Sequence, residues 1–378
     1  MNALQRERRL MALVQACQTL ANPKTPQGKA LRKDLLAQGP LSESGVELAL
    51  TEHLELEPSI QDRKALMAAA GQADVVHVLL SANVFVGALR ALALAAVAAP
   101  HVVVRMSRRE SVFARHLLDA VDKRAFGYPI EIVDSLMIPN SCEGEAHEVH
   151  LYGSNSTIVQ VASSLPEFVR IRAHGSGLGL AVVETSCSTN DAAQAVAASM
   201  IPFDQRGCLS PRIALVHGDE SRAWRFSQAL LSCLERAGTK IPLGDLLPEE
   251  RAERARYQDI CRMAGTLFDS PHGCVGLTGG SLWIPPIGRN MHVLACQPAE
   301  VETVLRPWLR RIVAAVGIAG GDGGDLATMV QRVVPKARVS AADRMQKPPL
   351  DGPVDRRTPE PLAPSEVIRI FRDEYEGG

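Results

Sequence analysis

The sequence has few aromatic residues, almost no net charge and no paired cysteine motif. Phe, Trp and Tyr make up 4% of its 378 residues, too few for the base-stacking platforms of proteins that bind single-stranded nucleic acid. A formal net charge of −1 provides no positive field for a phosphate backbone, so we expect no nucleic-acid partner. The eight cysteines include no CxxC pair, which argues against a zinc ribbon, and we assign no metal ligands.

A long apolar run covers 78–104, but a charged residue interrupts it. Arg90 lies near its middle, and a central Arg costs roughly 2.5–3.5 kcal/mol in a membrane helix. The run is better explained as a buried strand–helix–strand unit at 75–80, 86–98 and 101–105. The first residues are too charged for a signal peptide, so we expect a cytoplasmic protein with reduced thiols and no membrane span.

Helical and strand-like segments alternate along most of the chain. Residues 1–70 are predicted to be helical, and from residue 73 strands alternate with helices, which indicates an α/β fold with a mainly parallel sheet. A glycine cluster near residue 175 marks the expected domain boundary. The second region begins with an Ala-rich helix, whose expected N-cap is Asn190 or Asp191.

The C-terminal third combines apolar, glycine-rich and proline-rich stretches. The pattern predicts a helix over 301–315 and a loop over 317–325. That loop lacks the lysine and hydroxyl residue of a P-loop, so we infer no nucleoside triphosphate site. After Arg338 the chain is rich in proline, which predicts an extended arm that ends in a short helix over 365–375.

One cysteine directly follows a glycine at the end of the Ala-rich helix. Around Cys208 the predicted order is helix, tight turn, cysteine and strand. Such a turn can hold a thiol as an exposed nucleophile, because Gly207 allows a conformation that a residue with a β-carbon could not follow. The same spacing fits a buried, unreactive thiol, which is what we expect of the other seven cysteines. The spacing alone leaves both interpretations open.

Three further runs resemble known motifs. His174-Gly175-Ser176-Gly177-Leu178-Gly179 has the glycine spacing of a dinucleotide fingerprint, but strands are predicted on both sides, where the fingerprint needs a helix. His147-Glu148-Val149-His150 lacks the HExxH spacing and lies in a predicted strand, so we give it no metal role. Gly153 and Ser154 precede a predicted helix over 155–164, whose first N–H groups suit a pyrophosphate or belong to a simple turn.

Several runs together resemble one known family. Asp204-Gln205-Arg206-Gly207-Cys208-Leu209-Ser210-Pro211 is similar to the active-site run of long-chain acyl-CoA reductases. These are the fatty acid reductases of bacterial luminescence, a branch of the aldehyde dehydrogenase superfamily. Matches in one order from about 75 to 350 make chance a poor explanation. The other matching runs are Ser81-Ala82-Asn83-Val84, Val102-Val103-Val104-Arg105-Met106-Ser107, Tyr152-Gly153-Ser154, His174-Gly175-Ser176-Gly177 and Arg344-Met345-Gln346-Lys347-Pro348-Pro349-Leu350.

The resemblance implies an α/β, aldehyde-dehydrogenase-like fold with a Rossmann-type cofactor domain and an α/β catalytic domain. The expected ranges are an NAD(P)-binding domain at 1–175, a catalytic domain at 176–338 and a C-terminal arm at 339–378 that returns to the cofactor domain. The implied reaction is NADPH-dependent reduction of acyl-CoA, or another acyl thioester, to an aldehyde. The alternatives are a CoA-acylating or aldehyde-oxidising dehydrogenase, or a degenerate non-catalytic member.

The resemblance also assigns catalytic roles. It makes Cys208 the nucleophile, with the Asn83 amide and the Cys208 N–H holding the developing oxyanion. Taken without the family, Asn83 is an ordinary helix N-cap. Hydrolytic members of the superfamily have a glutamate where this chain has Ala173 and His174, so the acyl-enzyme should persist until it is reduced. His174 is a candidate proton donor, and a turn histidine without a catalytic role fits equally well.

Basic and hydroxyl residues follow the second strand of the expected cofactor domain, namely Arg105, Ser107, Arg108 and Arg109. The family has a lysine at the place of Arg105, which binds the adenosine ribose. An arginine can also pair with a 2′-phosphate in bidentate fashion, so we expect NADPH, with NADH possible. A solvated strand end is the alternative. The other expected cofactor-binding residues are Gly153, Ser154 and Gly175.

The resemblance implies two kinds of partner, namely the acyl thioester substrate and other protein chains. The family resemblance leads us to expect a homo-oligomer. An acyl-activating enzyme is a further expected partner, because it would supply the acyl thioester. The tail over 351–378 is then either an ordered arm or a docking peptide for that enzyme.

Overall fold

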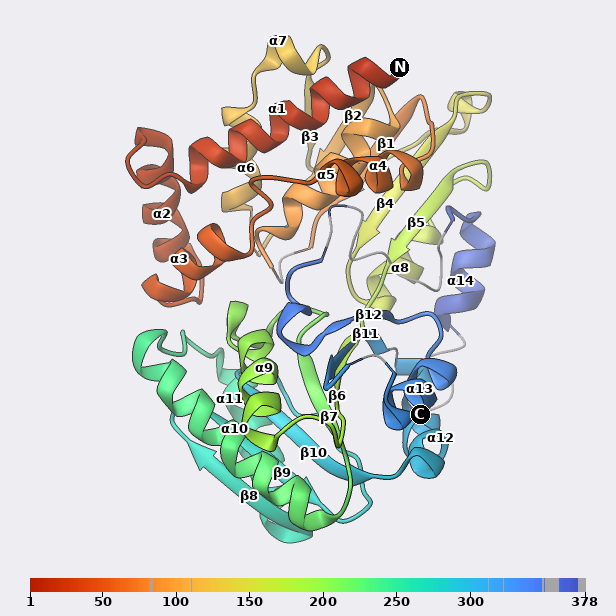
Figure 1. Cartoon of the computed structure of the whole chain (residues 1–378). Helices are drawn as coiled ribbons and strands as arrows, with labels where there is room; N and C mark the ends of the chain where they lie inside the picture. The colour runs from red at the N-terminus through yellow and green to blue at the C-terminus, as the bar shows by residue number, and fades with distance from the viewer. Residues whose placement is uncertain are drawn as a thin grey trace. The chain divides into compact units, whose positions relative to one another are not determined.

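The chain folds into two compact units, each built on its own sheet (Figure 1). The computed structural model describes residues 1–81, 84–109, 111–311, 313–321, 323–348, 350 and 360–372, with 310, 311 and 313 described by their main chain alone. Unit 1 comprises Met1–Gly39, Leu50–Ser176 and Pro348–Gly378, and unit 2 comprises Pro40–Ala49 and Gly177–Lys347.

The unit bounds differ from the expected domain ranges at two places. Residues 40–49 belong to unit 2, where the Ser42 hydroxyl donates to the Pro242 carbonyl at 2.8 Å. Residues 339–347 also belong to unit 2, because the strand Arg338–Ala341 pairs with a strand of its sheet. The C-terminal segment therefore counts with unit 1 only from Pro348 onward.

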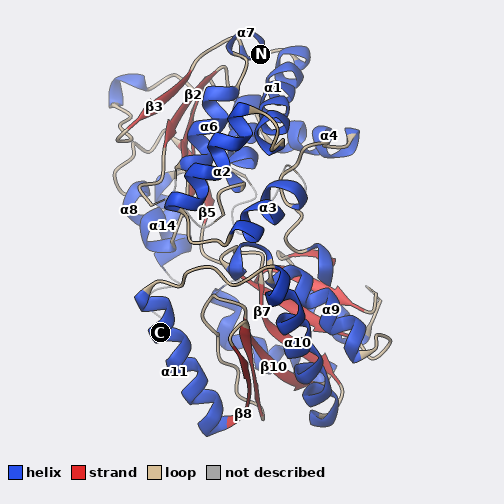
Figure 2. Cartoon of the chain, turned by 90° about the vertical axis from the view of Figure 1, so that its left-hand side faces the viewer, coloured by secondary structure: helices blue, strands red, loops and turns tan. Residues whose placement is uncertain are grey.

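Unit 1 is a parallel five-stranded sheet in the order β3-β2-β1-β4-β5, with helices packed against it (Figure 2). Its strands are β1 (Val75–Leu79), β2 (His101–Arg105), β3 (Ile130–Val133), β4 (His147–Tyr152) and β5 (Arg170–His174). Its helices are α1 (Ala3–Ala21), α2 (Pro26–Gln38), α4 (Ile60–Ala69), α5 (Gly87–Ala98), α6 (Val112–Ala120), α7 (Lys123–Phe126), α8 (Asn155–Ala162) and α14 (Pro364–Arg372). Helix α3 (Glu43–Glu52) begins in the 40–49 segment and lies mostly in unit 2, and only its last residues, from Leu50, belong to unit 1.

The apolar run is a buried β1–α5–β2 unit, as the sequence predicted. Every residue of α5 from Ala88 to Ala98 is buried. Arg90, its one charged residue, pairs with the Glu55 carboxylate, which satisfies the cation inside the protein. Among the described residues, no helix is both long and apolar enough to cross a membrane.

The opposite face of this sheet is covered by α8 and α14. Val149, Ile171 and Ala173 point into an apolar cluster that Val367 and Phe371 of α14 complete. The C-terminal segment joins the sheet edge. The Ile171 N–H donates to the Leu362 carbonyl at 2.7 Å, and the Leu362 N–H donates to the Ile171 carbonyl at 2.9 Å. The predicted helix over 365–375 is observed as α14, which begins one residue earlier and is described up to Arg372. Residues 373–375 lie outside the described residues.

Unit 2 is a seven-stranded sheet in the order β12-β11-β6-β7-β10-β9-β8, parallel except for the β8–β9 pair. Its strands are β6 (Leu178–Val183), β7 (Pro211–His217), β8 (Gly265–Ser270), β9 (Gly273–Thr278), β10 (Asn290–Cys296), β11 (Val313–Ala319) and β12 (Arg338–Ala341). Its helices are α9 (Thr189–Met200), α10 (Glu220–Lys240), α11 (Pro248–Ala264), α12 (Val301–Leu305) and α13 (Asp325–Val333).

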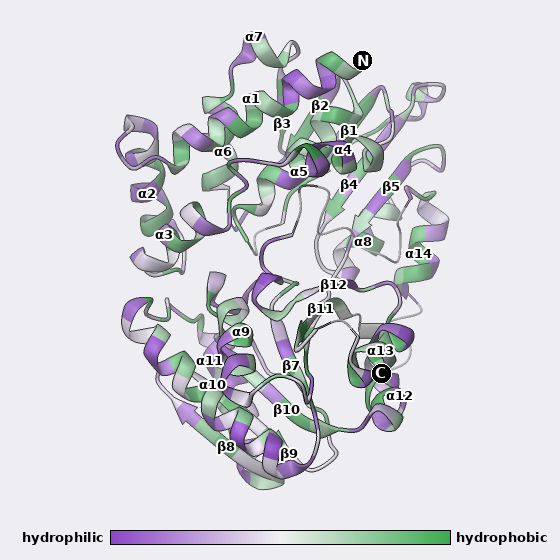
Figure 3. Cartoon of the chain, in the orientation of Figure 1, coloured by the Kyte–Doolittle hydropathy of each residue, from purple (hydrophilic) through white to green (hydrophobic). Residues whose placement is uncertain are grey.

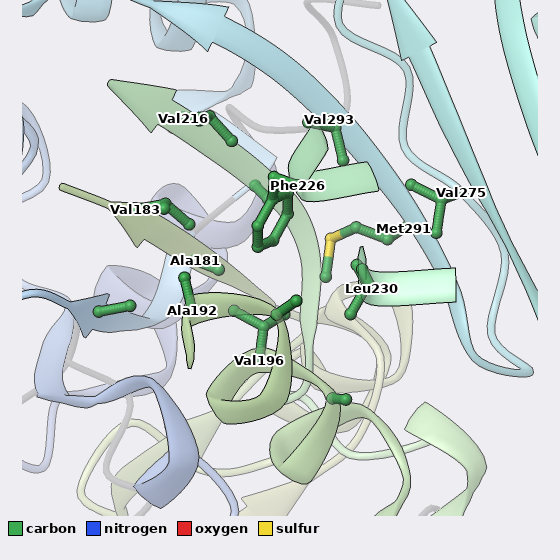
Figure 4. Packing of buried hydrophobic residues seen from close by; sticks show 14 of the residues in the cluster. Ala181, Val183, Ala192, Val196, Val216, Phe226, Leu230, Val275, Met291 and Val293 are labelled. Atoms are coloured by element: carbon green, nitrogen blue, oxygen red, sulfur yellow. The ribbon is translucent and has the colours of Figure 1, made fainter. Parts of the chain in front are cut away.

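Successive side chains along the strands of unit 2 point to opposite faces of the sheet, and an apolar core forms on each face. Ala181 and Val183 of β6 face α9 and α10, where Phe226 fills the centre of the cluster (Figure 4). Leu180 and Val182 face the other way, toward α12 and α13. Helices of both units carry one apolar and one polar side, visible as green and purple turns on α1 of unit 1 and α10 of unit 2 (Figure 3).

The predicted helix over 301–315 is wrong. The segment contains α12, a 3₁₀ stretch at Arg306–Arg311 and then β11, which lies between β6 and β12. Pro307 cannot continue an α-helix, and the small apolar residues beyond it suit a buried parallel strand. The first three residues of the expected loop over 317–325 belong to β11, and its last residue, Asp325, begins α13.

The Ala-rich helix α9 begins earlier than predicted. Its N-cap is Ser188, whose hydroxyl accepts from the Asp191 N–H at 3.1 Å. Neither Asn190 nor Asp191 is the cap. The Asp191 carboxylate accepts from the Ser188 hydroxyl at 2.6 Å, so it supports the cap from the first turn.

Candidate active site

Cys208 lies in a short turn of unit 2 between α9 and β7, in the predicted order of helix, turn, cysteine and strand. It is half-buried, and it packs in a small cluster with Leu209, Ala315 and Met345. A 3₁₀ turn at Pro202–Gln205 leads directly from α9 into this segment. The thiol is therefore attached to a short link between two rigid elements.

The unusual backbone before Cys208 lies upstream of the expected glycine. Phe203, Asp204 and Gln205 have φ values of 56°, 50° and 66°, so three consecutive residues are left-handed. Gly207 is not among the glycines with positive φ, which corrects the expectation that it creates the turn. Left-handed backbone costs roughly 1–2 kcal/mol for each residue with a β-carbon. Other contacts must therefore hold this turn in place.

A buried ion pair anchors the left-handed turn. The Arg289 guanidinium donates to Asp204 Oδ1 at 2.7 Å, and both side chains are almost fully buried. Asp204 Oδ2 accepts from the Gly244 N–H at 3.0 Å, while Arg289 Nη1 donates to the Ile241 carbonyl at 2.8 Å. Burial lowers the pKa of Arg289, and the Asp204 carboxylate opposes that shift.

The Gln205 side chain closes the segment that carries Cys208. Its Nε2 donates to the carbonyls of Pro211 and Asn290, each at 2.7 Å, and its Oε1 accepts from the Asn290 N–H at 2.8 Å. Pro211 and Asn290 are the first residues of β7 and β10, which are neighbouring strands. The amide therefore bridges the amino ends of two strands and ties both ends of the 205–211 segment together.

The C-terminal run around Met345 supports the other side of the same turn. Gln346 Nε2 donates to the Ser210 hydroxyl at 3.0 Å, and that hydroxyl donates to the Ser199 carbonyl at 3.2 Å. Met345 packs against Leu209 and Cys208. These contacts give a physical role to a motif that the sequence presented only as part of a resemblance.

Gly179 lies where β6 approaches the Cys208 turn most closely. Its N–H donates to the Ser210 carbonyl at 3.1 Å. A β-carbon at this position would lie 2.6 Å from the carbonyl oxygens of both Leu209 and Ser210. The last glycine of the 174–179 run thus serves close packing between strand and turn. Strands β5 and β6 flank that run, which confirms that it is not a dinucleotide fingerprint.

Most other thiols of the chain are in environments that suppress reactivity. Burial raises the pKa of six of them above its usual range: Cys17, Cys187, Cys233, Cys261, Cys274 and Cys296. A raised pKa lowers the fraction of thiolate, the nucleophilic form. These six are therefore poor nucleophiles at neutral pH. Five of them are buried, as expected, whereas Cys187 is only partly buried, and so is Cys142.

The predicted cofactor residues of unit 1 lie at the carboxyl edge of its sheet. Gly153 and Ser154 follow β4, and the Ser154 hydroxyl caps α8 by accepting from the Thr157 N–H at 3.2 Å. The Gly153 N–H donates to the His174 carbonyl at 3.1 Å, and Asn155 Oδ1 accepts from the N–H of the residue after Gly175 at 2.9 Å. The structure thus brings Gly153, Ser154 and Gly175 together.

Arg105, Ser107 and Arg108 lie at the same edge, where Arg105 is the last residue of β2 and the other two follow it. Arg105 Nε donates to the Asp134 carbonyl at 3.3 Å, whereas Arg108 is exposed. Ser107 accepts from the N–H of Arg109 at 3.2 Å. Strand β1 separates this group from the Gly153 turn, because β2 and β4 flank β1 in the sheet.

His174 lies at the end of β5 and stacks on Tyr152. The ring centroids are 4.2 Å apart and the planes differ by 1°. Arg172 and His150 lie two residues earlier on the same strands. Arg172 Nε donates to the Glu148 carboxylate at 3.1 Å, and His150 contacts the same carboxylate at 2.8 Å. This buried row fixes the strands that carry Tyr152 and His174. Asn83, the expected oxyanion partner, lies outside the described residues.

The HEVH run does not bring its two histidines together. His147 and His150 point to opposite faces of β4, and His147 contacts His77 at 3.2 Å. Cys142, Glu145 and His147 offer ligand atoms within 4.8 Å of one another. All three lie within one short turn leading into β4, so the turn itself brings them close, and we assign them no metal.

Solved structures share the fold of this chain. The chain resembles an NAD-dependent benzaldehyde dehydrogenase from Corynebacterium glutamicum, with 15% identity, a TM-score of 0.64 and coverage of 98% of this chain and 83% of that one. A propionaldehyde dehydrogenase from the Clostridium phytofermentans fucose utilisation bacterial microcompartment has 11% identity, a TM-score of 0.64 and coverage of 97% and 91%. An NADP-dependent glyceraldehyde-3-phosphate dehydrogenase from Bacillus halodurans C-125, complexed with NADP, has 12% identity, a TM-score of 0.58 and coverage of 97% and 85%. The fold is aldehyde-dehydrogenase-like, with a Rossmann-type part and a second α/β part, as expected.

A sequence comparison then identifies the family. The model of the family described as acyl-CoA reductase (LuxC) matches residues 29–283, about two thirds of the chain, and this match includes Cys208. The chain belongs to that family and is an aldehyde-forming acyl-CoA reductase. No curated protein matches the sequence significantly.

Proposed function

We propose that the chain reduces an acyl thioester to an aldehyde through an acyl-enzyme on Cys208, with NADPH as the reductant. The observation that carries this proposal is the placement of Cys208. It is a half-buried thiol on a turn that Gln205 and Gln346 hold through hydrogen bonds to the Pro211 carbonyl and the Ser210 hydroxyl. Such a fixed thiol suits covalent catalysis, because its sulfur can be kept in line with a bound carbonyl carbon.

In the proposed reaction, the Cys208 thiolate attacks the thioester carbonyl and expels the carrier thiolate, so a new C–S bond replaces the old one. The carrier thiolate then takes up a proton. NADPH, when bound, supplies the hydride that reduces the acyl carbon. The resulting thiohemiacetal oxyanion collapses, its C–S bond breaks, and the aldehyde leaves while Cys208 returns to the thiolate. The Cys208 N–H and the Asn83 amide are the proposed donors to the oxyanion.

The carboxyl edge of unit 1 fits a nicotinamide dinucleotide. In a doubly wound sheet, ligands bind where strands on either side of a switch point diverge, which here is between β1 and β4. The Gly153–Ser154 turn and the start of α8 lie at this point and offer main-chain N–H donors for a pyrophosphate. Arg105 and Arg108 at the end of β2 supply cations for the adenosine end. These residues are the proposed cofactor contacts.

The residues at the turn after β5 favour reduction of the acyl-enzyme over its hydrolysis. Hydrolytic members of the superfamily activate water with a glutamate at this turn, and this chain has Ala173 and His174 there instead. Ala173 faces the apolar cluster under α8, and the His174 ring stacks on Tyr152. His174 stays a proposed proton donor for the departing groups, with the stack holding its ring.

Intact-mass measurement tests the proposal directly. The protein is exposed to a panel of acyl-CoAs without NADPH, and we expect one acyl adduct, which peptide mapping places on Cys208. Adding NADPH should remove the adduct and release an equivalent of aldehyde. An adduct on another cysteine, or aldehyde formation with no adduct in rapid-quench samples, would contradict the proposal. The panel also reports which chain lengths the enzyme accepts.

Replacing Arg105 by glutamine should weaken NADPH binding more than NADH binding. A hydrogen bond to a charged group contributes about 1.5–3 kcal/mol, so the KM for NADPH should rise about tenfold or more. The KM for NADH should change little, because NADH lacks the 2′-phosphate. Arg124→Gln, on α7 of the same unit, is the matched control and should leave both values unchanged. Equal losses for both cofactors in Arg105→Gln would rule out recognition of the 2′-phosphate.

The proposal extends to partners. The acyl group arrives as acyl-CoA or from an acyl-activating enzyme, and the chain works as a homo-oligomer. Analytical ultracentrifugation of the chain alone and with a candidate acyl-activating enzyme measures both associations. A monomer at all concentrations would contradict the oligomer, and the absence of a mixed complex would contradict the direct transfer.

A further inference from the structure

Positive φ values outside glycine are confined to one place in the described part of the chain. They occur at Phe203, Asp204, Gln205 and Arg289. Two of these residues, Asp204 and Arg289, form the buried ion pair described above. Both residues of the pair therefore have a left-handed backbone conformation. The pair connects the turn before Cys208 with the turn before β10.

Backbone strain of this kind persists only where several independent contacts hold the same conformation. Here the Asp204 carbonyl accepts from the Gly288 N–H at 3.1 Å, in addition to the contacts of its carboxylate. The Arg289 guanidinium reaches the carbonyls of Ile241 and Pro242 at 2.8 and 3.4 Å. The pair therefore holds three segments of unit 2 around one buried point.

The location of this strain points to the segment that carries Cys208. The pair lies at the amino end of β7 and β10, next to the turn that carries the thiol, rather than in either apolar cluster of unit 2. Gln205 is the third left-handed residue. Its side chain donates a hydrogen bond to the Pro211 carbonyl, so it connects the strained turn to the far end of the Cys208 segment. A chain of direct contacts thus runs from the ion pair to both ends of that segment.

We propose that Asp204 and Arg289 are positioning residues for the Cys208 thiol. They hold the left-handed turn, and through Gln205 they fix the direction in which the thiol leaves the turn. The proposal rests on the role of Cys208 given above. It adds that the rate of acylation depends on this ion pair, although neither side chain needs to touch the substrate.

Asp204→Asn separates the ion pair from backbone preference, because asparagine has nearly the shape of aspartate and tolerates left-handed backbone. We expect kcat to fall about 10²-fold, the scale of a misplaced reacting group, while the KM for acyl-CoA stays within about threefold. Hydrogen exchange of the peptide that contains 206–210 should become roughly tenfold faster, and exchange of β7 should not. Arg289→Lys should recover part of the kcat that Arg289→Met loses, because it keeps the cation.

Glu184→Gln is the matched control. Glu184 is also buried in unit 2, where it pairs with His217 at 2.9 Å and accepts from the Ala327 N–H at 2.6 Å. It follows the carboxyl end of β6, whereas Cys208 precedes the amino end of the neighbouring β7. This variant should lower the melting temperature and leave both kcat and exchange at 206–210 within about twofold of the native protein.

The possible outcomes separate this inference from the mechanism on which it rests. If Asp204→Asn keeps native kcat and native exchange at 206–210, the positioning role is wrong. The same holds if Asp204→Asn and Glu184→Gln lower kcat in proportion to their loss of melting temperature, since the pair would then be only structural. If the turn loosens as expected but no acyl adduct forms on Cys208 in the native protein, the cysteine mechanism is wrong. The structural link between pair and turn would still hold.

Discussion

Cys208→Ala should lose aldehyde formation from acyl-CoA on the order of 10⁴-fold or more, since removal of a covalent nucleophile leaves only binding and the oxyanion donors. We expect the Cys208→Ala variant to fold, because the side chain is small and only half-buried. Its cluster retains Leu209, Ala315 and Met345. Steady-state assays with both cofactors measure the rate, and intact mass measures the adduct. Both signals should disappear together.

Cys187→Ala is the matched control for that experiment. Cys187 is a free, partly buried cysteine of the same unit, and burial raises the pKa of its thiol. Its replacement should leave the rate within about twofold and the acyl adduct unchanged. A Cys208→Ala protein that kept full reductase activity would show that the acyl group is never attached to this residue.

The parts of the fold that the sequence predicted depend on local patterns. The strand–helix–strand unit around Arg90 and the order of elements around Cys208 follow from apolar runs and turn residues that are close in sequence. The failed helix over 301–315 shows the limit of such patterns. A short apolar run suits a buried strand or a helix equally, and only Pro307 argued locally against a continuous helix.

The support of the site could not be predicted, because it is built from distant residues. Asp204 lies within the run that drew attention to Cys208, but nothing in the sequence pairs it with Arg289. Gln346 belonged to a recognised run, yet its contact with Ser210 appears only in the fold. Contacts of this kind arise when strands such as β7 and β10 become neighbours, which a single sequence does not state.

The backbone of the turn gives the clearest case of a plausible rule that failed. Glycine is the usual residue for positive φ, so the sequence pointed to Gly207. The structure instead places the left-handed conformation on Phe203, Asp204 and Gln205. Side chains are what make this possible, because a glycine at 204 or 205 would relieve strain but remove the ion pair or the bridging amide. The strained residues are thus chosen for their contacts rather than for their backbone.

Gly179→Ala should damage the site severely without touching any reacting group. The new β-carbon would lie 2.6 Å from the carbonyl oxygens of Leu209 and Ser210, and neither main-chain group is free to turn away. The Ser210 carbonyl accepts a hydrogen bond from the Gly179 N–H, and the Ser210 hydroxyl accepts one from Gln346 Nε2. The turn must therefore shift as a body, which should cost about 1–3 kcal/mol of unfolding free energy.

A displaced turn moves the Cys208 thiol, so the activity of Gly179→Ala should fall about 10²-fold even where the protein stays folded. Gly323→Ala is the control, because a β-carbon there meets nothing within 4 Å and its φ is not in the left-handed region. Denaturant unfolding measures the stability of both variants, and acylation by acyl-CoA in a single turnover measures the thiol. Native acylation by Gly179→Ala would mean that the turn accommodates the methyl group and that close packing against β6 does not set the position of Cys208.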